Sequence, residues 1–98
     1  MMRITLTRHA RAKLRERALP LDAVRRVIEA PEYRFYDVVS DVEVSIGETE
    51  LDGRHTILAV VFIRRDKRIR IVTAYPCKGM LEEIERKERL GRWVRLVS

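Results

Sequence analysis

Four side chains that could handle a phosphate group lie close together in one short basic stretch. Residues 7–17 read TRHARAKLRER, which includes His9, Lys13, Glu16 and Arg17. An imidazole and a carboxylate can exchange protons near neutral pH, while ammonium and guanidinium groups bind phosphate oxygens. These residue types therefore allow acid–base chemistry on a phosphodiester.

The spacing of these residues predicts a helix over residues 7–17, with Thr7 as its N-cap because the hydroxyl can accept a bond from the first turn. At 100° per residue, three apolar residues share one narrow sector, namely Leu6, Ala10 and Leu14. Three polar residues fill an adjoining sector about 60° wide, namely His9, Lys13 and Glu16. Arg17 lies at the apolar edge. The helix therefore presents either an ordinary solvated rim or one side of a phosphate site.

Length and composition set bounds on such a site. The chain of 98 residues is expected to form one domain, without an apolar run that could span a membrane and without a leader peptide. The single cysteine, Cys77, has no disulfide partner within the chain. We therefore expect a cytoplasmic protein.

The charge is unevenly distributed along the chain. The net charge is +6, yet residues 36–53 contain six acids and none of the 21 lysines and arginines. A basic remainder favours a polyanionic partner such as nucleic acid. The acidic segment would then face away from the nucleic acid or contact a basic partner. The alternative is that the many arginines only form a solvated surface.

The remaining pattern predicts an α+β fold. A second helix is expected from Pro20 to before Pro31, and a third over residues 80–90. Between them, four segments have the composition of strands: 33–39, 42–48, 55–63 and 68–75. We predict two N-terminal helices packed on a four-stranded, mainly antiparallel sheet, plus a C-terminal helix.

Finer features of these elements are also predicted. Residues 2–6 form an extended lead-in or a short edge strand, and Asp52-Gly53 forms a hairpin turn. Simple alternation places Ile69, Ile71, Thr73 and Tyr75 on one side of the last strand. In the segment 42–48, alternation leaves Glu43, Ser45 and Gly47 on a solvated side. Trp93 is expected to cover either the end of the core or a second chain.

Metal and cofactor chemistry are not predicted, because His, Cys and acidic residues lack metal-ligand spacing and the glycines form no phosphate loop. Metal-free RNA cleavage remains, since RNA supplies its own 2′-OH nucleophile and needs only an acid, a base and cations. Each candidate also has a simpler structural explanation. His9, Arg68 and Arg70 could be ordinary solvated residues, and Glu16 could be an ion-pair partner. His55 could make a structural hydrogen bond, and Tyr75 could belong to the core.

The order of these motifs resembles a widespread prokaryotic domain family of unknown function. The segments that carry the resemblance are HARAKLRERAL, a second helix ending in EAP, and IVTAYP, within about residues 4–77. The family pattern is His-Ala, a basic residue, Met or Leu, and Glu-Arg-Gly, with Val-Thr-Ala-Tyr in the final strand. This family is grouped with RelE-like toxins, including the BrnT type, in the small-RNase fold of barnase, EndoU and the RNase colicins.

The resemblance implies one site lined by the first helix and the last strand. Its residues are His9, Lys13 (where arginine is usual), Glu16, Arg17, Thr73 and Tyr75. It also implies a cytosolic RNase acting on mRNA or tRNA, with the ribosome as one place of action, and an antitoxin protein as inhibitor. Ala18 departs from the pattern, which has glycine there, so the following turn is expected to differ.

We therefore predict a metal-independent endoribonuclease of toxin–antitoxin type. The predicted catalytic residues are His9, Glu16, Arg17 and Thr73, and the substrate-binding residues are Lys13, His55, Arg68, Arg70 and Tyr75. Two alternatives stay open. The same basic face could bind RNA or DNA without cleaving it, or the chain could be an interaction protein that forms a homodimer through its acidic strands and its C-terminal helix.

Overall fold

The computed structural model describes residues 2–96. It begins with strand β1 (Arg3–Leu6) and helices α1 (Arg8–Glu16) and α2 (Leu21–Glu29). The other elements are β2 (Tyr33–Asp37), β3 (Val42–Leu51), β4 (Arg54–Arg65), β5 (Arg68–Pro76), α3 (Met80–Arg89) and β6 (Trp93–Arg95). In this part of the chain, no helix is long and apolar enough to cross a membrane.

The described strands form one sheet in the order β1-β5-β4-β3-β2-β6. Its centre is the predicted antiparallel meander of β2, β3, β4 and β5. The prediction of four strands was incomplete at one edge, because β6 pairs antiparallel to β2. At the other edge β1 pairs parallel to β5, which was one of the two roles predicted for residues 2–6. A strand as short as β6 depends on hydrogen bonds to a neighbour far away in sequence, which local patterns do not reveal.

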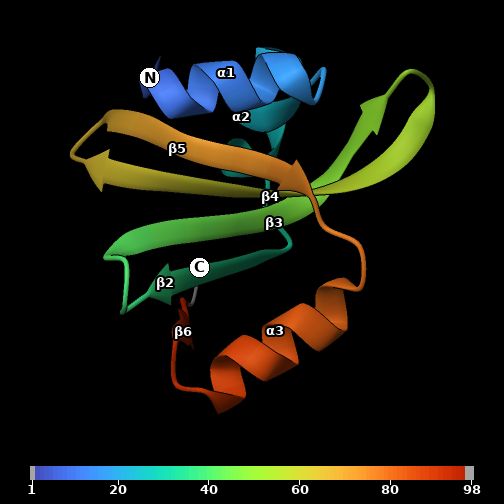
Figure 1. Cartoon of the computed structure of the whole chain (residues 1–98). Coiled ribbons are helices and arrows are strands. Elements are labelled where there is room, and N and C mark those ends of the chain that lie inside the picture. Colours follow the sequence, from blue (N-terminus) through green and yellow to red (C-terminus); the bar gives the residue numbers. More distant parts are fainter. Residues whose placement is uncertain (1, 97–98) are drawn as a thin grey trace.

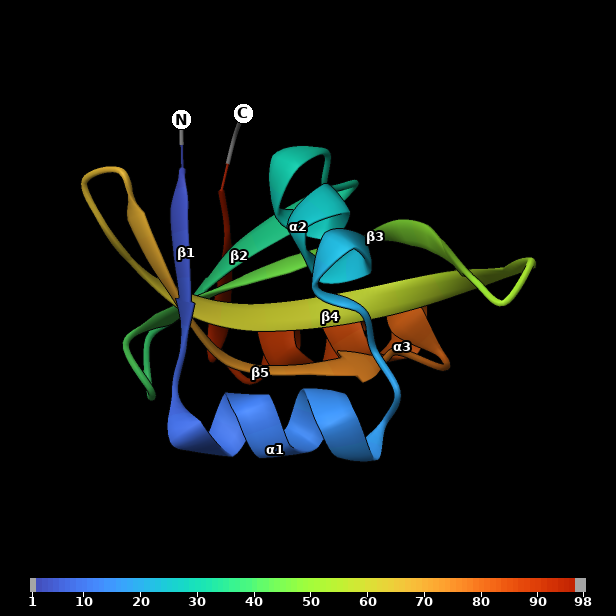
Figure 2. The same cartoon turned by 90° about the horizontal axis from the view of Figure 1, so that it is seen from above.

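Helices cover both faces of the sheet. α1 and α2 lie on one side and α3 lies on the other (Figure 1). Seen from above, α1 runs alongside β5 rather than across the middle of the sheet (Figure 2). The sequence pattern had not predicted which face α3 would cover. Two separate apolar layers exist because the central strand β4 is apolar on both alternations, as its sequence predicts.

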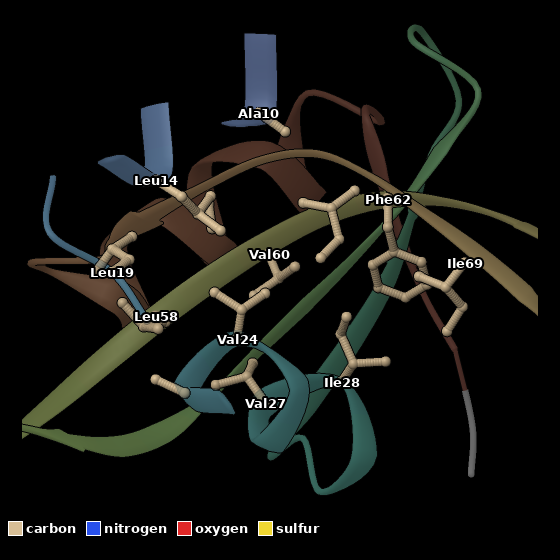
Figure 3. Packing of buried hydrophobic residues seen from close by; sticks show 13 residues of the cluster. Ala10, Leu14, Leu19, Val24, Val27, Ile28, Leu58, Val60, Phe62 and Ile69 are labelled. Carbon is tan, nitrogen blue, oxygen red and sulfur yellow. The ribbon is translucent and has the colours of Figure 1, made fainter. Parts of the chain in front are cut away.

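The first core lies between the N-terminal helices and the sheet. Its side chains point toward one another from α1, α2 and the strands (Figure 3). Helical residues Leu14, Val24 and Val27 meet Phe62 and Ile69 of the sheet, and all five side chains are buried. This core fixes α1 at the side of β5, which positions the candidate site.

The second core lies under α3. Ile84 of α3 and Trp93 of β6 pack with Phe35, Ile46 and Ala59 on the other face of the sheet. The Trp93 ring stacks on Phe35 with centroids 5.0 Å apart. Trp93 therefore covers the core of its own chain, which was one of the two predicted roles for it.

The face of β3 that was expected to be solvated is largely covered. Ser45 and Gly47 are both buried. A Cβ atom on Gly47 would meet the Ala30 carbonyl oxygen and the Pro31 Cα at 3.4 Å, because the link between α2 and β2 crosses there. The alternation was read correctly, but it could not show that α2 would cover this side of the strand.

Local signals at turns and caps were reliable. Thr7 caps α1 by accepting a 2.9 Å hydrogen bond from the Ala10 amide. Asp52 and Gly53 both adopt the left-handed region, with φ of 52° and 75°, as expected for a tight hairpin between β3 and β4. These residues determine local geometry from their own chemistry, so the sequence was sufficient to predict it.

Candidate functional site

The candidate site begins where β1 leaves β5. β1 pairs with β5 only as far as Leu6 opposite Ile71. The Thr7 amide then donates to the Ile71 carbonyl oxygen at 3.1 Å, and the Thr7 hydroxyl lies 3.5 Å from the Val72 carbonyl oxygen. From this point α1 replaces β1 at the side of β5 (Figure 2). Side chains of α1 can therefore reach the second half of β5.

The end of α1 holds Arg17 in a defined position. The Leu19 amide donates to the Leu14 carbonyl oxygen at 2.8 Å, and the Ala18 amide donates to the Arg15 carbonyl oxygen at 3.1 Å. This pair of bonds is a Schellman motif, and the buried side chains of Leu14 and Leu19 supply its usual apolar contact. Ala18 has φ 53°, the left-handed conformation that favours glycine. The α1 terminus is therefore closed in the manner for which glycine is usual, although alanine occupies the position.

Arg17 spans the gap between α1 and β5. Its Nη1 atom donates to the Ala74 carbonyl oxygen at 2.8 Å and to the Thr73 Oγ1 atom at 3.3 Å. The side chain makes no ion pair with an acid of the described chain, and the residue is exposed. A guanidinium group carries five N–H donors, so its other donors remain available to an external anion.

A β-bulge decides which side chains of β5 accompany Thr73. The register of β4 and β5 shifts at Val61, so that Thr73 is opposite Val61 while Ile71 is opposite Phe62. The extra residue, Val72, interrupts the alternation. The prediction that Ile69, Ile71, Thr73 and Tyr75 share one side was therefore wrong, because the bulge moves the last two to the opposite face.

The same shift gathers polar residues that simple alternation had separated. Arg70, opposite Ile63, lies on the same face of the sheet as Thr73 and Tyr75. Arg68 shares this face, and both arginines are exposed. A run of hydrogen-bonding and cationic groups therefore follows one face of β5.

Tyr75 completes the group. Burial raises the pKa of its phenol, and the nearby Cys77 and Glu83 raise it further, while the positive charge of Arg17 opposes them. The phenol therefore stays protonated at neutral pH and can donate a hydrogen bond. We call Arg17, Thr73 and Tyr75 the α1–β5 site.

The remaining polar residues of α1 lie further along the helix. Lys13 pairs with Glu16, with Nζ 3.2 Å from Oε2. His9 is exposed and makes no side-chain hydrogen bond or ion pair within residues 2–96. His9 precedes Arg17 by eight residues, or about 12 Å along the helix axis. Of the residues predicted to line one site, Arg17 and Thr73 are therefore in direct contact, whereas His9 lies about two turns away along α1.

His9 still lies on the same flank of α1 as the site. Successive steps of four residues lead from His9 to Lys13 and then to Arg17, and each step turns the helix by about 40°. The three side chains therefore follow an arc of about 80°. A ligand that extends along the helix, rather than one small group, could contact all of them.

His55 does not belong to this group. It lies on the β3–β4 hairpin, with Nε2 4.0 Å from the Glu50 Oε1 atom. It comes three positions before Leu58, the residue that pairs with the end of β5 at Pro76. His55 lines an open groove with residues of α2 and β3, among them Ala23 and Thr49. Within residues 2–96, its side chain makes no hydrogen bond or ion pair with Arg17, Thr73 or Tyr75.

Two contributors to the site were not identified from the sequence. The Ala74 carbonyl oxygen is the nearer acceptor for Arg17, and Glu83 of α3 influences the Tyr75 phenol. The residue type at position 74 does not indicate that its backbone carbonyl oxygen will accept a hydrogen bond from Arg17. Glu83 reaches this region because the turn after Pro76 brings α3 under the sheet, which is a tertiary effect.

The other flank of α1 carries further cations. Three further arginines of α1 are exposed and take part in no ion pair within the described residues: Arg8, Arg11 and Arg15. No cluster of three or more potential metal-ligating side chains occurs in residues 2–96. At 100° per residue, Arg8, Arg11 and Arg15 project at least about 120° away from Arg17, so they do not belong to the α1–β5 site.

Comparison with protein-family models, with curated proteins and with solved structures yields no match to this chain.

Proposed function

We propose that this protein is a metal-independent endoribonuclease that binds RNA along α1 and β5. The observation that supports the proposal is the exposed guanidinium of Arg17, held on Thr73 and Ala74 with donors left for a phosphate. Lys13, Arg68 and Arg70 would bind neighbouring phosphates of the same strand. A single-stranded substrate fits the linear arrangement of these groups better than one isolated phosphate does.

The proposed reaction needs no component beyond protein and RNA. The 2′-oxygen attacks the adjacent phosphorus, the bond to the 5′-oxygen breaks, and the products are a 2′,3′-cyclic phosphate and a 5′-hydroxyl. A base takes the 2′-OH proton and an acid protonates the leaving 5′-oxygen. His9 and Glu16 are the proposed acid–base groups, while Arg17 stabilises charge on the phosphorane and the Tyr75 phenol donates a hydrogen bond.

The resemblance of HARAKLRERAL and IVTAYP to the family grouped with RelE and BrnT toxins supports this class of activity. It adds a biological role, which is cleavage of mRNA or tRNA in the cytoplasm under the control of an antitoxin protein. Expression of the protein should then arrest growth. Co-expression of a small protein encoded next to it should relieve the arrest.

A second candidate function is RNA binding without cleavage. The observation that favours it is the separation of His9 from Arg17 by about 12 Å along α1, together with the pairing of Glu16 to Lys13. In this case the basic residues hold RNA and no proton transfer occurs. Affinity would depend strongly on salt, but the RNA would stay intact.

The deciding experiment is incubation of EDTA-treated protein with total RNA. The wild type is compared with His9→Ala and Arg17→Ala, and with Arg54→Ala as a control on the distant hairpin. We expect cleavage by the wild type and by Arg54→Ala, and strong loss in the other two. Intact RNA at micromolar wild-type protein would exclude the nuclease, and cleavage that survives both substitutions would exclude this site.

A further inference from the structure

A second surface lies away from the α1–β5 site, between the start of α2 and the β3–β4 hairpin. It is an open groove of about 560 Å³. Residues of both elements line it: Pro20, Asp22, Ala23, Arg26, Glu48, Thr49, Glu50 and His55. The proposed ribonuclease uses none of them.

Among residues 2–96, one side of this groove is a sheet edge without a neighbouring strand. β2 pairs with β3 only as far as Tyr33 opposite Ile46, while β3 continues to Leu51. The Glu32 amide donates to the Ile46 carbonyl oxygen at 2.8 Å, which shows that Ile46 points its backbone groups toward β2. In an antiparallel ladder, alternate residues point the same way, so Glu48 and Glu50 offer their N–H and C=O groups to an absent strand.

The groove is acidic, although the protein as a whole is basic. Glu48 and Glu50 are exposed, and Asp22 lies in the first turn of α2. The opposing charges are Arg26 and, when protonated, His55, which is 4.0 Å from Glu50. A polyanion would be repelled here, whereas a basic polypeptide is complementary in charge.

Thr49 is the most buried residue of the groove lining. It lines the groove while only 4% of its surface is exposed. Thr49 therefore contributes a polar residue to the lining of the groove beside Glu48 and Glu50.

We infer that this groove binds an extended, basic segment of a partner protein as an additional strand beside β3. The backbone of the segment would bond to Glu48 and Glu50, and its lysines or arginines, on one face of the added strand, would pair with the carboxylates of Glu48 and Glu50. Backbone bonds give such a complex its affinity, and alternate side chains give it specificity. The inference does not depend on the proposed ribonuclease activity, because the two surfaces share no residue.

The test uses a synthetic peptide of alternating arginine and valine, with binding measured by calorimetry. The control peptides are the same sequence N-methylated at alternate residues, which cannot complete a ladder, and a glutamate–valine repeat. We expect saturable binding of the basic peptide alone. No binding at about 1 mM peptide, or equal binding of the N-methylated peptide, would overturn the inference.

Variants of the protein locate the contact. Glu48→Gln combined with Glu50→Gln should weaken binding at least about tenfold, whereas Glu82→Gln combined with Glu85→Gln on α3 should leave it unchanged. All four positions are exposed, so folding should be retained. Equal weakening by both pairs would mean that only total charge matters, which contradicts a specific groove.

Hydrogen exchange supplies a readout that charge alone would not change. The amides of Glu48 and Glu50 should exchange more slowly when the basic peptide is bound, because they become hydrogen-bonded. Protection confined to another part of the sheet would contradict the proposed edge. RNA cleavage should be the same for the Glu48 and Glu50 variant as for the wild type, so failure of either proposal can be recognised separately.

Discussion

Arg17 and Thr73 are 56 positions apart in the sequence, and the Arg17 Nη1 atom donates to the Thr73 Oγ1 atom at 3.3 Å. The contact depends on two backbone features at once. The Schellman motif after α1 places Arg17 at its terminus, and the bulge at Val72 turns Thr73 to the face that Arg17 reaches. A change in either feature should therefore alter the α1–β5 site.

Replacement of Arg17 should weaken RNA binding in a salt-dependent way. We expect Arg17→Ala to lose about tenfold in affinity for single-stranded RNA, the value of one charge-assisted bond. The plot of log affinity against log salt should also become shallower by about one unit. Fluorescence anisotropy over a salt series measures both. Arg54→Ala, on the β3–β4 hairpin, should keep the wild-type slope, and an unchanged slope for Arg17→Ala would argue against a phosphate contact.

Thr73 should act by positioning Arg17. Thr73→Val keeps the side-chain shape and removes the oxygen that accepts from Arg17, so the free energy of unfolding should fall by less than about 1 kcal/mol. RNA affinity should fall about two- to fivefold, because only the Ala74 carbonyl then orients the guanidinium. Thr73→Ser restores the acceptor and should restore affinity. If Ser and Val behaved alike, the hydroxyl would have no role in the site.

A substitution at Ala18, two positions after the end of α1, should stabilise the fold. Ala18 has φ 53°, a conformation that costs about 1 kcal/mol for an L-residue with a Cβ atom. We expect Ala18→Gly to raise the free energy of unfolding by about 0.5 kcal/mol, since glycine removes the strain but adds freedom to the unfolded chain. Urea denaturation measures the change. The reverse substitution, Gly91→Ala at φ 71° with open space around it, should destabilise the fold by a similar amount.

Asp37 should be the most sensitive polar residue of the fold. Its carboxylate is 5% exposed and accepts from the Val39 and Ser40 amides, the Arg92 Nε atom and the Trp93 indole N–H. Asp37→Ala would leave the indole donor and both amides unpaired, so we expect a loss of about 2 to 4 kcal/mol in chemical denaturation. Glu82→Ala, at an exposed position, should change stability little. A comparable loss for both would show that the network is unimportant.

The same carboxylate predicts a dependence of stability on pH. Burial tends to raise the pKa of Asp37, but the hydrogen bonds from Ser40, Arg92 and Trp93 and the charge of Arg92 outweigh it, so the pKa lies below 3.8. The unfolded chain therefore binds the proton first as pH falls. The contribution of Asp37 to stability is present above about pH 4 and is lost as pH falls toward the native pKa. In this pH range, the free energy of unfolding should depend less on pH for Asp37→Asn than for the wild type. An unchanged pH dependence would contradict the role given to the Asp37 carboxylate.

Much of the secondary structure could be predicted from local signals. The apolar period of α1, the cap at Thr7 and the left-handed Asp52-Gly53 turn each act within a few residues, so their sequences were sufficient. The two apolar alternations of β4 likewise indicated a central strand. Residue type identified Arg17 as a candidate, whereas Thr73 and Tyr75 entered the predicted site through the family resemblance.

The sequence by itself determined which residues could do chemistry and which segments are helices or strands, because these depend on side-chain chemistry and short-range periodicity. Only the tertiary structure decided which candidates meet. The bulge at Val72 arises from pairing with β4 and has no local signal, yet it brings Thr73 and Tyr75 to the face of Arg70. The helical rise of α1 places His9 about two turns from Arg17. His55 lies on the β3–β4 hairpin beside Glu50 and is not part of the α1–β5 site. Both positions depend on strand register and helix packing, which local sequence patterns do not reveal.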